Sequence, residues 1–297
     1  MNFLSEFEFY LTISYYYVQY NKIIKYQQGK TMQEDLLKNI DSVPSLPESV
    51  QEVERLYRDI DSTFEDMQVA IDKDPFLTAN ILRLVNSPLY GMRTKVTSVQ
   101  KAISLLGKGA IRTFVLSSAI DSNFEIDLSA YKITNEQFRL ACERQMALGM
   151  HWHRQAKSAS LLATTAFLVD IGRLIISKTL IEEDKSDFIA EALASGLSIS
   201  EAEMKACGSS STEVTATLFT HWELDSNIIS LIRYSENPQE TVQEEKEMAA
   251  ELKAIRETVL LNGEITEESM SAAKETIEKF GLDLEAYEKA LAKILDA

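Results

Sequence analysis

Residues 74–91 read Asp-Pro-Phe-Leu-Thr-Ala-Asn-Ile-Leu-Arg-Leu-Val-Asn-Ser-Pro-Leu-Tyr-Gly, and they predict one helix with a defined start and a defined end. Asp74 is a capping carboxylate, and Pro75 occupies a first helical position, where an N–H group would have no helical partner. Ser87 precedes Pro88 and is therefore disfavoured in the helical region, so the helix must end before it. The apolar residues between these ends keep the spacing of a buried helix face: Leu77, Ile81, Leu82, Leu84 and Val85.

The same helical pattern continues along most of the chain. It predicts a short helix over Ser98–Leu106 that Gly107 breaks, and longer helices over residues 138–157 and 160–177. The sequence Ser200-Glu-Ala-Glu203 has the form of a capping box, which marks a further helix start. No segment alternates apolar and polar residues as a strand does, and ten Gly and five Pro in 297 residues are few for a β-rich protein. The sequence therefore predicts an all-α fold.

The chain is acidic, with 30 Lys and Arg against 46 Asp and Glu and a net charge of −16. Nucleic acids and anionic membranes are bound through cationic side chains, so this balance argues against both as partners. The two cysteines, Cys142 and Cys207, are far apart and exclude a disulfide framework, which is typical of a reducing compartment. No run of about 20 uncharged apolar residues predicts a membrane-spanning helix. We expect a cytoplasmic protein without membrane insertion.

Composition divides the chain into three parts. Residues 1–31 contain six Tyr and three Phe with a net charge of +1, whereas Met32 reads like a natural start, so the leader is either an accidental extension or an aromatic helix that docks on the body or a partner. Residues 32–240 carry the helical pattern. Residues 241–297 hold 14 acidic and 7 basic residues and predict an acidic helical extension. The extension contains an apolar stripe that can pack on the body: Ile277, Phe280, Leu284 and Leu291.

The sequence contains no motif of established catalytic chemistry. It has no glycine-rich phosphate loop and no Gly-x-Ser-x-Gly nucleophile elbow. His151 and His153 lie two residues apart on a predicted helix, so they point in different directions and cannot bind one metal ion together. We interpret these two histidines and His221 as packing or surface residues, and we expect no metal and no cofactor.

The segment that follows residue 85 has two interpretations. Asn86 and Ser87 can hydrogen-bond to the last turn of the preceding helix, which Pro88 ends, and the segment is then structural. Tyr90 and Arg93 can instead be exposed on a rigid loop and form a docking surface for a partner or ligand. We favour the structural interpretation and keep the second open.

Two sets of residues form recognisable motifs. The first is Val43-Pro-Ser-Leu-Pro47, then residues 74–91, then residues 98–107 with the ending Ala-Ile-Ser-Leu-Leu-Gly. The second is Phe167-Leu-Val-Asp-Ile-Gly-Arg173, followed by residues 213–224 and 232–238. Together they resemble the HDOD family, the HD-related output domains of bacterial signalling proteins. The resemblance covers about residues 37–238 and implies a multi-helix HD-like domain, to which the C-terminal helices are appended.

The resemblance also implies where a metal site would lie. HD-domain phosphohydrolases hold divalent metal with a His-Asp pair and further histidines, and this chain has Val169-Asp170 at the place of that pair. The places of the other histidines carry no imidazole: Ala141, Ser211 and Ser235-Glu236. A single carboxylate does not build a sound metal centre. We therefore interpret Asp170 as a structural acid that caps a helix or pairs with an arginine such as Arg173.

Three functions remain in comparison. The first, which we favour because the ligands are missing, is a non-catalytic module that binds other signalling proteins in chemotaxis, motility, two-component or cyclic-dinucleotide circuits. The second is a residual metal-dependent phosphohydrolase that uses Asp170, Glu213 and Glu236. The third is a sensor that binds a nucleotide, through Asp170 among others, in the vestigial cleft without cleaving it. The sequence leaves homodimerisation open.

Overall fold

The computed structural model describes residues 32–86, 92, 94–123, 126–153 and 156–295, and in these residues it contains helices and no strand. The all-α prediction is therefore confirmed. The leader of residues 1–31 lies outside the described residues. A helix of residues 32–41 begins the described chain.

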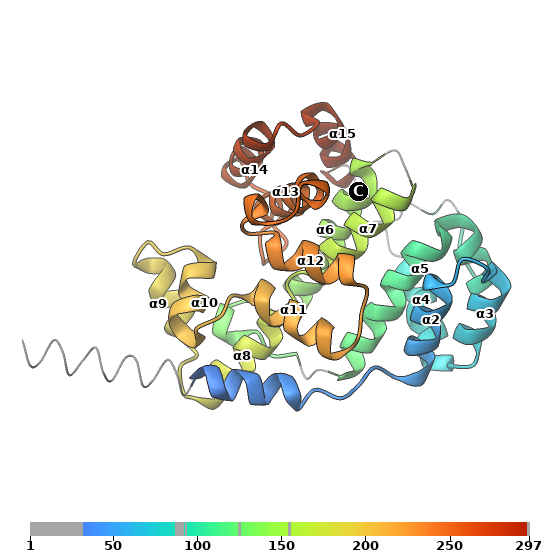
Figure 1. Cartoon of the computed structure of the whole chain (residues 1–297), viewed down its shortest axis with the longest axis horizontal. Helices are drawn as coiled ribbons and strands as arrows, with labels where there is room; N and C mark the ends of the chain where they lie inside the picture. The colour runs from blue at the N-terminus through green and yellow to red at the C-terminus, as the bar shows by residue number, and fades with distance from the viewer. Residues whose placement is uncertain (1–31, 87–91, 93, 124–125, 154–155, 296–297) are drawn as a thin grey trace, which may run out of the picture.

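Figure 1 shows how the helices follow one another along the chain. The first part of the chain forms α2 (Glu48–Arg58), α3 (Phe64–Asp72), α4 (Pro75–Val85), α5 (Val99–Asn123), the 3-10 turn η2 (Ser129–Tyr131), α6 (Asn135–Trp152) and α7 (Ala156–Leu168). The second part forms α8 (Gly172–Glu182), α9 (Phe188–Ala194), α10 (Ile199–Cys207), α11 (Ser211–His221), α12 (Ser226–Tyr234), η3 (Pro238–Glu240), α13 (Gln243–Thr258), α14 (Glu267–Phe280) and α15 (Leu284–Leu295).

The start of α4 confirms its predicted signals. Asp74 Oδ1 accepts hydrogen bonds of 3.0 Å from the N–H groups of both Phe76 and Leu77, with Pro75 in the first turn. Gly107 interrupts α5 with φ 80° and ψ 167°, a conformation that glycine tolerates because it has no Cβ. The predicted break after Leu106 is therefore confirmed.

Three predicted helices have other boundaries in the structure. The helix predicted over residues 138–157 ends at Trp152, where α6 stops and His153 is extended. Residues 160–177 do not form one helix, because α7 ends at Leu168 and α8 begins at Gly172. The hydroxyl of Thr215 accepts the Gly172 N–H at 2.8 Å and lies 3.0 Å from the Val169 carbonyl oxygen, so it satisfies groups that a continuous helix would pair itself.

The predicted capping box is also displaced by two residues. The N-cap of α10 is Ser198, whose hydroxyl accepts from the Glu201 N–H while the Glu201 carboxylate accepts from the Ser198 N–H. The sequence holds two overlapping Ser-x-x-Glu patterns, and local spacing alone does not choose between them. Glu203 therefore does not cap α10, and its side chain is buried in the interior.

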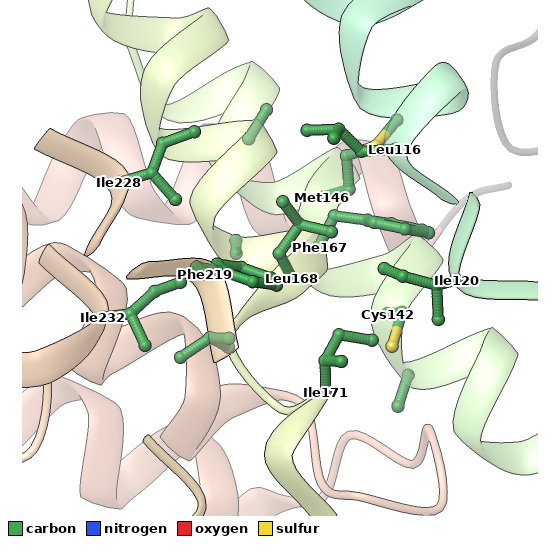
Figure 2. Close-up of a cluster of buried hydrophobic side chains, with 14 of the residues drawn as sticks. Leu116, Ile120, Cys142, Met146, Phe167, Leu168, Ile171, Phe219, Ile228 and Ile232 are labelled. Carbon is green, nitrogen blue, oxygen red and sulfur yellow. The ribbon is translucent and has the colours of Figure 1, made fainter. Parts of the chain in front are cut away.

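The core joins helices from both parts of the chain. Figure 2 shows side chains of α5, α6 and α7 packed together with those of α11 and α12, and all of them are buried. Gly149 lets α6 approach α7 closely, since a Cβ at this position would lie 3.1 Å from the backbone of Ala163. A buried ion pair links α5 to α2: Arg112 donates to both oxygens of Glu54 at 2.6 and 2.7 Å.

The C-terminal helices pack on the body. Figure 1 shows α13, α14 and α15 on one side of α6, α7 and α12, and α13 contacts all three of these helices while α15 contacts α6. Of the predicted apolar stripe, Ile277 and Leu291 are buried, whereas Phe280 and Leu284 are partly buried.

Two segments, Val99–Ile120 and Ser158–Glu182, are long and apolar enough to pass as membrane spans by length and composition. Their most apolar windows are 67% and 89% buried inside the protein, respectively, and the second segment contains the turn between α7 and α8. Core helices of a water-soluble protein have the same composition, so these segments are weak evidence for a membrane protein.

The closeness of α8 to α11 at Gly172 gives a test of the packing. In Gly172→Ala, the new Cβ would lie 2.2 Å from the Ser211 carbonyl oxygen, so one helix must shift. We expect a loss of about 1–3 kcal/mol in the free energy of unfolding, measured by urea denaturation. The control Ser104→Ala, at an exposed position of α5, should change it by less than about 0.5 kcal/mol. Equal stabilities of the two variants would contradict the described packing.

Candidate functional site

The site begins at Asp170, in the turn between α7 and α8, which is only 2% exposed. Its Oδ1 lies 2.7 Å from Nη1 of Arg173 and 3.0 Å from Nη2 of Arg256, and its Oδ2 accepts a hydrogen bond of 3.0 Å from the amide of Gln145. The predicted pairing of Asp170 with Arg173 is confirmed. Both carboxylate oxygens are thus bound by protein groups.

Arg173 extends these contacts to a second buried carboxylate. Its Nε lies 3.0 Å from Oε1 of Glu203 on α10, and this oxygen also accepts a hydrogen bond of 3.0 Å from the hydroxyl of Tyr131. The other oxygen of Glu203 accepts the Ser211 N–H at 2.7 Å, at the start of α11. Glu203 therefore links η2, α8, α10 and α11. It also gives Arg173 a second carboxylate partner, while Asp170 is shared between Arg173 and Arg256.

Arg256 brings the C-terminal extension into the site. It lies on α13, its side chain is 12% exposed, and besides Asp170 it contacts Oε1 of Glu236 at 3.4 Å. Glu236 also accepts a hydrogen bond of 2.5 Å from the hydroxyl of Ser200. We name the five charged residues the Asp170 cluster: Asp170, Arg173, Glu203, Glu236 and Arg256.

The charges of the cluster set its protonation. Burial acts to raise the pKa of Asp170, but the guanidinium groups of Arg173 and Arg256 outweigh it and hold the pKa below its ordinary value. Burial likewise acts to lower the pKa of Arg173, whereas Asp170 and Glu203 raise it well above the usual range. Burial, with the Glu203 charge, raises the pKa of Tyr131, so its hydroxyl stays protonated and donates.

The places where the family's histidines would stand do not form a metal centre. Ala141 is a buried apolar residue, and Gln145 one turn later is the residue that reaches Asp170. Ser211 uses its backbone N–H for Glu203, and the Ser235 hydroxyl donates to the Ile232 carbonyl at 2.8 Å. Across the part of the chain that the structure describes, no three His, Cys, Asp or Glu residues gather as metal ligands would.

The residues present also oppose a divalent cation electrostatically. A metal ion on Asp170 would lie next to two guanidinium groups that already contact the same oxygen, and like charges at such distances repel strongly where water is excluded. Of the other two carboxylates considered in the sequence, Glu236 shares Arg256 with Asp170, whereas Glu213 is half exposed and pairs with Arg233 at 3.3 Å. The donor set therefore does not fit the metal that the HD superfamily binds.

Asn86 has the structural role that its sequence position predicts. Its amide donates to the Leu82 carbonyl at 2.6 Å and to the Val96 carbonyl at 2.9 Å, and its oxygen accepts the Val96 N–H at 2.8 Å. It thus holds the returning chain against the end of α4. The other residues predicted there lie outside the described residues: Ser87, Pro88, Tyr90 and Arg93.

A large groove lies away from the cluster. It has a volume of about 1220 Å³ and runs between α2, the turn from α3 to α4, and the turn after α11. His221 and Trp222 line it, and Asp170 does not. The groove therefore does not include the place where the resemblance would put a metal site.

One histidine makes an interaction that sequence patterns do not show. His153, at the end of α6, lies 2.8 Å from Oε2 of Glu251 on α13, and this hydrogen bond raises the pKa of His153. The bond is one of several polar links between the body and the extension, besides the contacts of Arg256. It agrees with the interpretation of the histidines as packing residues.

Comparison with known proteins places the chain in a family. Residues 43–238 match the family described as the HDOD domain. An uncharacterised protein of Treponema pallidum (strain Nichols) is 28% identical over 106 residues, which are 36% of this chain and 20% of that protein. The match thus spans about a fifth of that relative's length.

Solved structures share the fold over most of the chain. A candidate phosphohydrolase of Shewanella amazonensis SB2B is 22% identical, with a TM-score of 0.65 and coverage of 87% of this chain and 93% of that one. A virulence factor of Campylobacter jejuni subsp. jejuni is 26% identical, with a TM-score of 0.53 and coverage of 89% and 94%. A candidate signal transduction protein of Marinobacter aquaeolei VT8 is 18% identical, with a TM-score of 0.66 and coverage of 91% and 64%.

The lowered pKa of Asp170 predicts an acid-sensitive contribution to stability. Since the folded-state pKa lies below the unfolded value of about 3.9, the ionised carboxylate stabilises the fold fully above that pH, and this stabilisation is lost as the pH falls through the folded-state pKa. Asp170→Asn should therefore be less stable than wild type by about 3 kcal/mol at neutral pH, and the difference should shrink below about pH 4. Urea denaturation over this pH range measures it, with Asp41→Asn as the exposed control. A difference that does not depend on pH would contradict the ionised cluster.

The burial of Arg256 predicts that it stabilises more than a surface arginine does. Arg256→Met leaves the buried Asp170 with one arginine partner in place of two, and partly exposed Glu236 without this contact, so we expect a loss of about 3 kcal/mol. Arg233→Met removes a matched side chain from an exposed pair with Glu213 and should lose less than about 1 kcal/mol. Thermal and urea unfolding of both variants provide the comparison, and equal losses would show that burial gives Arg256 no special role.

Proposed function

This chain belongs to the HDOD family, and on that premise we propose that it is a signal-transduction module that acts through contacts with other proteins and catalyses no reaction. The observation that carries the proposal is the state of Asp170. The resemblance to HD-domain phosphohydrolases assigns this carboxylate to the place of their metal-binding aspartate, and here both of its oxygens are bound by Arg173, Arg256 and Gln145.

The energetics of the cluster favour this function over hydrolysis. Hydrolysis by the superfamily's chemistry needs a cation that activates water, and the cation must find carboxylate and imidazole ligands. A metal ion at Asp170 would first have to displace buried guanidinium groups, and breaking such a buried pair costs about 3–5 kcal/mol. The chain offers no imidazole at Ala141, Ser211 or Ser235 to offset that cost.

The solved relatives carry names of both kinds. The Marinobacter aquaeolei protein is named for signal transduction, which supports the proposal, and the Shewanella amazonensis protein is named for phosphohydrolysis, which supports the alternative. The cluster of this chain decides our choice between them. The proposal includes a cytoplasmic location, no resident cofactor, and other signalling proteins as partners.

The experiment combines metal analysis with an activity assay. The metal content of untagged protein is measured by plasma mass spectrometry. The protein is then given Mn²⁺ or Mg²⁺, and hydrolysis of cyclic dinucleotides and of p-nitrophenyl phosphate is assayed separately. We expect a molar ratio of metal to protein far below one, and a rate of hydrolysis no higher than that in buffer without protein. Asp170→Asn, checked by circular dichroism for folding, is the test variant, and Asp41→Asn is its matched control.

Stoichiometric metal with turnover that Asp170→Asn abolishes and Asp41→Asn retains would overturn the proposal in favour of the phosphohydrolase. Protection from thermal unfolding by a cyclic dinucleotide without its cleavage would favour the nucleotide sensor instead, because a ligand that binds only the folded state stabilises it.

A further inference from the structure

The turn between α2 and α3 exposes an isoleucine almost completely. Ile60 is 96% exposed, although turn positions are usually occupied by Gly, Pro, Asn, Asp or Ser. Phe64, four residues later in the first turn of α3, is 53% exposed. Figure 1 shows α2 and α3 at the end of the molecule opposite α9 and α10, and away from α8 and α13. Helices α8, α10 and α13 each carry a residue of the Asp170 cluster.

Hydrogen bonds order the backbone on both sides of Ile60. The Ser62 N–H donates to the Asp59 carbonyl at 3.3 Å, and the Asp61 N–H donates to the Asp59 carboxylate at 3.0 Å. The Ser62 hydroxyl donates to the Asp59 carbonyl at 2.9 Å, and Lys108 from α5 donates to this hydroxyl at 2.7 Å. Because the backbone of this turn is already ordered, docking requires little further ordering of the chain there, which favours affinity.

The other end of the segment is fixed as well. Thr63 and Asp66 form a reciprocal capping box that begins α3, with hydrogen bonds of 2.7 and 3.1 Å between side chains and backbone. Lys108 Nζ lies 6.0 Å from the centre of the Phe64 ring. Ile60 and Phe64 are thus two apolar anchors on a rigid frame.

Carboxylates surround these two side chains. Asp59, Asp61, Glu65 and Asp66 are all exposed, so residues 59–66 present four negative charges and no positive one. The nearby basic groups are engaged with the protein itself: Lys108 with Ser62, Arg55 with Glu52 at 2.8 Å, and Arg58 with the Glu223 carbonyl at 2.7 Å. The segment is therefore apolar at its centre and acidic at its rim.

We propose that residues 59–66, the α2–α3 knob, dock into an apolar socket that Lys and Arg side chains surround on a partner protein. Complementary charge selects this partner class. A second copy of the chain would oppose the same acidic rim with its own, and the net charge of −16 adds to that repulsion. The inference rests on the proposed function in one respect, since it assigns a surface to the protein contacts of the signalling module.

The first step of the test identifies what the knob touches. p-Benzoylphenylalanine is placed at position 60 of the full chain and, as a matched control, at position 76, where Phe76 is 85% exposed on α4. Irradiation in the native host followed by mass spectrometry should give a protein linked at position 60 and not at position 76. The identified protein is then purified, and its binding to the wild-type chain is measured by calorimetry.

The second step tests the chemistry of the contact. Ile60→Ser and Phe64→Ser should each lower the affinity at least tenfold, as buried interface anchors do, whereas Phe76→Ser should change it less than about twofold. Asp61→Lys and a rise in salt from about 50 to about 300 mM should also weaken binding, because both reduce the attraction between the rims. Ile60, Asp61 and Phe76 are largely exposed, so thermal unfolding of Ile60→Ser, Asp61→Lys and Phe76→Ser should match that of wild type. Phe64 is half buried, so the affinity of Phe64→Ser is measured at a temperature at which circular dichroism shows it folded.

Two crosslinking results would overturn the proposed docking role of the knob: no protein crosslinked at position 60 in excess of position 76, or crosslinking only to a second copy of the chain. Binding of Ile60→Ser to the partner as tightly as wild type would overturn it as well. These outcomes are distinct from failure of the proposed function. Metal-dependent hydrolysis would overturn the proposed function but would not change the result of the crosslinking at position 60. Absence of a crosslinked partner would overturn the docking role of the knob but would not change the result of the hydrolysis assay.

Discussion

The neutralisation of Asp170 by arginine is the interaction on which the rest of this structure depends. A buried carboxylate without a partner is strongly disfavoured, so the turn between α7 and α8 requires positive charge beside it. Arg173 supplies it from the next helix, and Arg256 supplies it from the C-terminal extension. Arg173 in turn requires Glu203, which holds α10 and the start of α11. One acidic side chain thereby couples elements that lie far apart in the sequence.

The same constraint connects the fold with the proposed function. A metal ion and a guanidinium group can both neutralise a buried carboxylate, but only the metal ion activates water. When the positive charge belongs to Arg173 and Arg256, the framework is stabilised and the Asp170 oxygen that they contact is occupied by protein groups. In the function that we propose, the protein acts through its surface. The α2–α3 knob, far from the cluster, carries Ile60, which at 96% exposure is the most exposed large apolar side chain among the described residues.

Much of the fold could be predicted from the sequence because its signals are local. Asp74-Pro75 and Gly107 mark helix ends through backbone chemistry that no distant residue alters. The break between α7 and α8 could not be predicted, since it depends on the hydroxyl of Thr215, 43 residues beyond Gly172. The pairing of Asp170 with Arg173 could be predicted from the sequence, because the two residues are only three positions apart. The contacts with Gln145, Glu203 and Arg256 could not be predicted, because each of these residues lies on another helix. Glu203 also belongs to a local Ser-x-x-Glu pattern that predicts a capping residue.

The most direct test of the central claim is the anomalous scattering of crystals soaked in Mn²⁺, with data collected at the manganese edge. The account predicts no manganese peak within coordination distance of the Asp170 carboxylate, and electron density for Arg173 and Arg256 in contact with its oxygens. A manganese ion bound to Asp170, with either guanidinium group turned away to admit it, would contradict the account.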